Sequence, residues 1–147
     1  MQREIKFRGI DIDSKKWVYG HYDITEEFTD NGGTGCYYRE GIQKLHHIIK
    51  EGLDWKIYTV YPKTVGQFIG LKDKNGVEIY EGDKVKVDYI NNEDRIIETV
   101  SVSYNKESCS YSPMDWEYDC DGCVCKLRIK TLEVVGNIYE EDKNEII

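Results

Sequence analysis

The chain has 147 residues, of which 39% are hydrophobic and 33% charged, and its formal net charge is −8. This balance is typical of a soluble, folded protein of one ordinary domain or two small ones, and it argues against disorder. The sequence contains no apolar run long enough to cross a bilayer, and its acidic charge disfavours non-specific binding to nucleic acid.

Aromatic residues indicate the fold class. The chain contains 12 Tyr and 3 Trp against 2 Pro, and it lacks the long patterns of Leu, Ala and Glu that are typical of helices. We therefore expect a mainly β protein, or α+β at most. The first residues lack the apolar core of a signal peptide, so we expect a cytoplasmic protein whose five Cys are thiols.

A β-hairpin is expected near the N-terminus. Ile5 and Phe7 alternate with charged residues as in a short strand, and residues 11–16 form a polar turn. A second strand then begins at Trp17 and continues through Tyr22. Because its aromatic residues lie on both faces, we expect each face of this hairpin to contact protein.

The following segment fits more than one structure. Residues 26–35 are acidic and then glycine-rich, so they are expected to form a flexible loop. Residues 42–50 have apolar residues at helical spacing, yet residues 46–50 and 55–61 also fit the two strands of a hairpin. The β-branched and aromatic residues of the second run favour the hairpin.

Two adjacent histidines, His46 and His47, lie in this expected strand. Neighbouring residues of a strand point to opposite faces, so these two side chains would not share one metal ion simply. We expect one packed and one exposed histidine instead of a metal site.

The strongest turn signal lies in the middle of the chain. Asp73, Lys74, Asn75 and Gly76 separate the apolar residues 68–71 from residues 77–80. Asn-Gly tolerates the positive φ values of a tight hairpin, so Gly76 is predicted to have a positive φ. Residues 81–83 form a second turn, after which a half-buried strand is expected.

The C-terminal half contains further expected strands, separated by turns. Residues 85–89, 100–104 and 123–129 alternate apolar and polar side chains, and residues 132–139 form the last strand. Residues 105–119 are expected to be a long loop or a ragged hairpin. Five strands between Phe68 and Tyr139 match a small β-barrel in number and spacing.

Three blocks of the sequence resemble the YopX family of bacteriophages and prophages of low-GC Gram-positive bacteria. They are residues 3–8, with the sequence Arg-Glu-Ile-Lys-Phe-Arg, residues 64–87 and residues 134–140. The resemblance implies an N-terminal β-rich subdomain over residues 1–67 and an SH3-like small barrel over residues 68–147, interlocked as one unit. It implies no catalytic motif. The glycine-rich loop and the segment 109–125 depart from the family pattern.

One cysteine cluster has metal-ligand spacing. Cys120, Cys123 and Cys125 include a Cys-x-x-Cys pair around a glycine, which is able to wrap zinc. No second such pair exists in the sequence, and a redox motif would open a helix instead of a strand. We expect ordinary thiols and no bound metal or cofactor, with these three cysteines as the weak zinc candidates.

No catalytic motif is evident, so we expect a non-enzymatic phage or prophage accessory protein that binds protein, itself included. The alternative is a nucleic-acid-associated factor with a basic stripe on the C-terminal barrel, interleaved with tyrosines. The stripe would consist of Lys84, Lys86, Lys126, Arg128 and Lys130.

We also expect a symmetric homo-oligomer, because open sheet edges and surplus aromatic surface favour pairing between chains. Its contacts are predicted to involve the hairpin from Trp17 to Tyr22 and a strand edge of the C-terminal half. A host or phage protein is a further expected partner, and a membrane is not.

Overall fold

The computed structural model describes residues 4–29, 41–52, 54–91, 94–106, 109–113 and 132–140. All of its regular elements are β-strands except one short 3₁₀ turn, η1 (Pro62–Thr64), which confirms the mainly β class. No helix in these residues has the length and apolarity needed to span a membrane. The chain divides into two compact units, Lys6–Val65 and Gly66–Ile147 with Met1–Ile5, and each is described separately.

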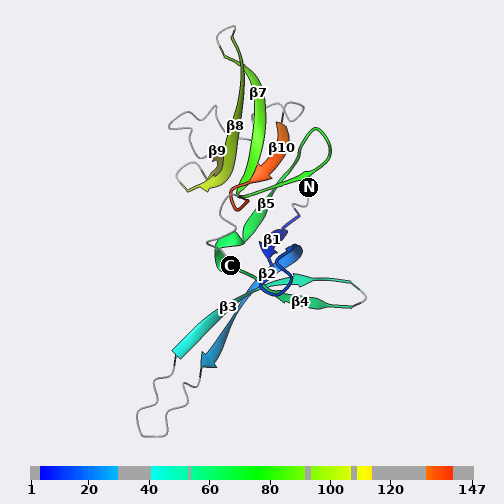
Figure 1. Cartoon of the computed structure of the whole chain (residues 1–147), viewed down its shortest axis with the longest axis vertical. Coiled ribbons are helices and arrows are strands. Elements are labelled where there is room, and N and C mark those ends of the chain that lie inside the picture. Colours follow the sequence, from blue (N-terminus) through cyan, green and yellow to red (C-terminus); the bar gives the residue numbers. More distant parts are fainter. Residues whose placement is uncertain are drawn as a thin grey trace, which may run out of the picture. The chain divides into compact units, whose positions relative to one another are not determined.

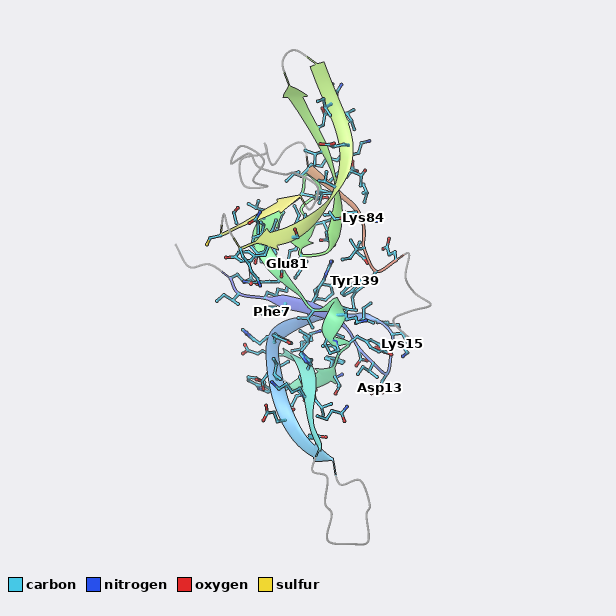
Figure 2. All side chains as sticks on the ribbon, turned by 90° about the vertical axis from the view of Figure 1, so that its left-hand side faces the viewer. Phe7, Asp13, Lys15, Glu81, Lys84 and Tyr139 are labelled. Atoms are coloured by element: carbon cyan, nitrogen blue, oxygen red, sulfur yellow. The ribbon has the colours of Figure 1, made fainter. Side chains whose placement is uncertain are left out.

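The N-terminal unit, Lys6–Val65, contains four antiparallel strands in the order β4-β3-β2-β1 (Figure 1). They are β1 (Phe7–Ile10), β2 (Trp17–Thr29), β3 (Gly41–Lys50) and β4 (Lys56–Thr59). The expected hairpin of β1 and β2 is confirmed, and its turn contains Asp13 and Lys15 (Figure 2). The strand expected around Ile5 begins only at Phe7, because its pairing with β2 starts there.

The first and last strands of this unit meet at one end. An isolated bridge joins Asp11 to Val60, next to hydrogen bonds from Ile12 N–H to Thr59 O (2.8 Å) and from Tyr61 N–H to Ile10 O (3.0 Å). These backbone contacts join the end of β1 to the end of β4, the two outer strands of the unit. The sequence analysis did not predict these contacts.

Residues 42–50 are a strand, so the hairpin alternative is confirmed and the helical alternative is wrong. β3 pairs with β2 on one side and with β4 on the other, which supplies the backbone partners that a helix would otherwise supply internally. Ile48 is fully buried on the inner face of the sheet.

The loop expected at residues 26–35 is wrong for its first four residues. Residues 26–29 continue β2 and pair with residues 41–44 of β3. Glu26 lies opposite Lys44, and their side chains form an ion pair of 3.8 Å. A cross-strand ion pair of this kind stabilises the two strands. The acidic residues of this stretch obscure the alternation of apolar and polar side chains by which a strand is recognised in a sequence. The glycines at 32, 33 and 35 lie outside the described residues.

The C-terminal unit contains the expected central hairpin, β5 (Gly66–Lys72) and β6 (Glu78–Tyr80). Its other strands form an antiparallel sheet in the order β10-β7-β8-β9 (Figure 1). They are β7 (Asp83–Asn91), β8 (Asp94–Asn105), β9 (Ser110–Pro113) and β10 (Leu132–Asn137). Strand β9 makes a hairpin of the segment after β8. The strand expected at residues 123–129 lies outside the described residues.

One hydrophobic cluster joins the hairpin to this sheet. Its buried members come from β5, β6, β7, β8 and β10: Ile69, Ile79, Val85, Val87, Val100, Val102 and Leu132. The alternation predicted for residues 85–89 and 100–104 thus places its valines correctly. The structure shows a sheet with a packed hairpin, and closure of these strands into a small barrel stays a prediction.

Gly76 has a φ of +83°, which confirms the predicted turn. A Cβ atom at this position would meet no heavy atom within 4 Å, so only the backbone conformation opposes a side chain. Gly76→Val is therefore expected to lower the unfolding free energy by about 1–3 kcal/mol, measured by urea denaturation. Gly52→Val is the control, because that glycine also faces open space and has no left-handed φ. Equal midpoints for both variants would contradict the prediction.

Candidate interaction surface

Three buried aspartates of the described residues each stabilise a turn. Asp11 Oδ2 accepts hydrogen bonds from the backbone N–H (2.9 Å) and the hydroxyl (2.6 Å) of Ser14. Burial raises the pKa of Asp11, but these hydrogen bonds outweigh it and hold the pKa below its usual value. Asp83 Oδ2 accepts from the Tyr80 N–H at 2.8 Å.

The third aspartate, Asp73, connects the central turn to the last strand. Its Oδ1 accepts from the N–H groups of Asn75 (2.7 Å) and Val77 (2.9 Å), and its Oδ2 accepts from Val134 N–H at 3.1 Å. Lys74 N–H also donates to the carbonyl oxygen of Leu132 at 3.0 Å. The turn therefore covers the outer edge of β10 at these residues. Each of these three buried carboxylates therefore accepts hydrogen bonds that hold a turn in place.

The two histidines lie on opposite faces of β3, as predicted. Both are half-buried, so the expectation of one packed and one exposed histidine is wrong. The His46 ring stacks on Tyr22 with centroids 5.8 Å apart, and its Nδ1 is hydrogen-bonded to the Tyr22 hydroxyl. Burial raises the pKa of Tyr22. His47 instead contacts the hydroxyl oxygens of Thr25 (2.8 Å) and Thr59 (3.5 Å). No three His, Cys, Asp or Glu side chains among the described residues are grouped as metal ligands.

The cysteine cluster lies outside the described residues. The zinc candidates Cys120, Cys123 and Cys125 therefore stay predictions from sequence, as does the absence of a metal. Of the described residues, Cys109 is a free and exposed cysteine.

Only part of the expected basic stripe lies in described residues. Val85 and Val87 of β7 face the core, so Lys84, which Figure 2 labels, lies on the other face of the sheet. Lys86 lies on that face too, by the alternation of the strand. Glu133 of β10 is the cross-strand partner of Lys86 on this face and forms a 2.6 Å ion pair with Lys74. The rest of the stripe lies outside the described residues: Lys126, Arg128 and Lys130.

Apolar side chains are exposed on the outer face of the N-terminal sheet. Tyr19 of β2 is 42% exposed, and Ile57 of β4 is 68% exposed. Trp55, which precedes β4, is 67% exposed. Trp17 lies on the same face, where the Arg8 guanidinium sits over its ring at 4.4 Å. The aromatics of the predicted N-terminal interface are therefore divided, with Trp17 and Tyr19 outside and Tyr22 on the inner face.

The N-terminal unit also presents an open strand edge. Val60 N–H donates to His46 O, so His46 directs its backbone groups toward β4. Backbone directions alternate along an antiparallel strand, so Tyr22, Ile24 and Glu26 of β2 direct their groups away from β3. β1 pairs with β2 only as far as Gly20. We call this side of β2, from Tyr22 to Glu26, the β2 edge, and no described strand pairs with it.

The arrangement is that of an all-β protein with structural carboxylates, exposed apolar side chains on one sheet face and an open edge. The family model for the YopX protein matches residues 6–143, and the chain belongs to the YopX family. The chain is also similar to the crystal structure of protein EF1440 from Enterococcus faecalis, with 21% identity and a TM-score of 0.48. That similarity covers 97% of this chain and 99% of the other. No curated protein matches the chain.

Proposed function

We propose that the protein is a non-catalytic phage or prophage accessory protein that works by self-assembly and by binding other proteins in the host cytoplasm. The observation that carries this proposal is the set of exposed apolar side chains on the outer face of the N-terminal sheet, with Tyr19 and Ile57 on it and Trp55 beside it. Several exposed apolar side chains on one face support an interaction site there. The net charge of −8 opposes random aggregation and is compatible with a closed, symmetric assembly.

Two observations favour this role over the alternatives. The buried aspartates accept hydrogen bonds from turns, so they do not supply the poised acid or base that hydrolytic chemistry needs. A nucleic-acid-binding stripe has less support, because the acid Glu133 lies beside Lys86 on the same face of the sheet.

Light scattering at micromolar concentration tests the proposal. We expect a mass that is a multiple of the single-chain 17.2 kDa. Ile57→Ser is expected to weaken assembly at least about ten-fold, because a buried Ile contributes more than the roughly 1.4 kcal/mol that this factor represents. Val77→Ser is the control, because Val77 is an exposed apolar residue of the central turn. A single-chain mass, or equal effects of both substitutions, would refute self-assembly through this face.

A further inference from the structure

We propose that the β2 edge captures an extended segment of a partner protein by strand addition, and that the segment alternates basic and apolar residues. This inference deepens the proposed interaction function and rests on it. At three positions along this edge, Tyr22, Ile24 and Glu26, the backbone N–H and C=O groups point away from β3 and are available to an incoming strand. Each is able to exchange two backbone hydrogen bonds, as in other strand-addition complexes.

The edge lacks three of the devices by which proteins protect an exposed strand, and the charges that it carries are all acidic. It has no Pro, no Lys and no bulge between Tyr22 and Glu26. Three other described edges, those of β10, β9 and β4, differ from it. The Asp73 turn covers β10, and β9 has only four residues and ends at Pro113. On β4, the Thr59 carbonyl already accepts from Ile12.

The side chains beside the edge define the chemistry of its occupant. Asp23, Thr25 and Glu27 lie on the outer face and are exposed. Tyr22 and Ile24 lie on the inner face, where Ile24 is 47% exposed. Successive residues of a docked strand alternate between the same two faces. Basic side chains would therefore lie beside the acids of the outer face, and apolar ones beside Tyr22 and Ile24.

Charge complementarity excludes an acidic occupant. The β2 side of the β2–β3 hairpin contains the acids Asp23, Glu26 and Glu27. The facing part of β3 contributes one Lys, Lys44, which pairs with Glu26. Like charges directly opposite each other destabilise a sheet, whereas opposite charges stabilise it. A segment with Lys or Arg at every second position meets this requirement.

A labelled synthetic peptide of seven residues, alternating Lys and Val, tests the inference by fluorescence anisotropy with the full-length protein. We expect it to bind at low salt and to weaken as salt is added. A peptide that alternates Glu and Val is expected to bind at least about ten-fold more weakly.

Proline substitutions test whether the peptide binds at the β2 edge or elsewhere on the β2–β3 hairpin. Ile24→Pro removes an N–H that points away from β3, so it blocks the β2 edge and keeps the ladder between β2 and β3. We expect it to weaken peptide binding about ten-fold, which corresponds to one or two backbone hydrogen bonds. Lys44→Pro is the matched control, because Lys44 lies opposite Glu26 and its N–H points out of the other edge of the ribbon. Because this substitution also removes the cation that pairs with Glu26, its affinity for the basic peptide should equal or exceed that of wild type.

Circular dichroism and the thermal midpoint establish that both proline variants are folded. If Ile24→Pro fails to fold, the double variant Asp23→Asn with Glu27→Gln decides, because it should weaken binding and flatten its salt dependence. Absence of peptide binding by wild type, or equal loss in both proline variants, overturns the inference.

Light scattering on the same samples distinguishes this inference from the proposed function. An oligomer that does not bind the peptide keeps self-assembly and refutes strand capture. A monomer that binds the peptide supports strand capture and refutes self-assembly. If Ile24→Pro dissociates an oligomer that does not bind the peptide, the occupant of the edge is a second copy of the chain, and the basic segment is refuted.

Discussion

Leu132→Ala is expected to lower the unfolding free energy by about 3 kcal/mol, within the range for truncation of a buried leucine. Leu132 is fully buried in β10, opposite Val87, and it belongs to the cluster that joins the hairpin to the sheet. Truncation removes apolar contacts from every side and leaves a cavity that the surrounding strands fill only in part. Urea denaturation followed by tryptophan fluorescence measures the change.

Val135→Ala is the matched control for this substitution. Val135 lies on the same strand, but its side chain is 52% exposed. Its truncation should change stability by no more than about 0.5 kcal/mol. Similar losses for the two variants would show that β10 does not close the core at Leu132.

Asp73→Ala is expected to cost about 3 kcal/mol or more. The substitution removes the charged acceptor of the N–H groups of Asn75, Val77 and Val134, and each hydrogen bond to a charged group contributes about 1.5–3 kcal/mol. Asp88→Ala is the control, because that carboxylate makes a surface ion pair with Arg95 and should contribute much less. Denaturation midpoints in urea compare the two. A larger loss for Asp88→Ala would contradict this account.

The same carboxylate makes stability depend on pH. Burial raises the pKa of Asp73, but the hydrogen bonds from Val134, Val77 and Asn75 together outweigh it and hold the pKa below its ordinary value. The folded state therefore binds this proton less readily than the unfolded state. The contribution of Asp73 is complete above the unfolded pKa of about 4 and is lost as the pH falls through the folded pKa. The difference in stability between wild type and Asp73→Ala should shrink below about pH 4.

Local patterns predicted the elements whose signals are local. Asn75 and Gly76 specified a turn because few residues tolerate its backbone angles, and the alternation of Val85 and Val87 specified both a strand and its buried face. The adjacent His46 and His47 were placed on opposite faces for the same reason.

Features that depend on pairing between distant segments were not predictable in this way. The bridge between Asp11 and Val60 joins residues with no shared pattern in the sequence. The β2 edge exists because the pairing between β1 and β2 ends at Phe7 and Gly20, and this end point depends on the register of the two strands. Charged residues at 26 and 27 suggested a loop, although they belong to a ribbon with two exposed faces.

The hydrogen bond from Val134 to Asp73 spans 61 positions of the sequence, and this separation has a consequence for the order of folding. The hairpin of β5 and β6 needs only neighbouring residues, so its turn is able to form early and at little cost in loop entropy. Strand β10 adds next to β7 only after a long loop has closed, which makes its docking a late step. A chain shortened before Leu132 would therefore retain the turn and leave Val87 and the β7 edge uncovered, as an intermediate prone to aggregation.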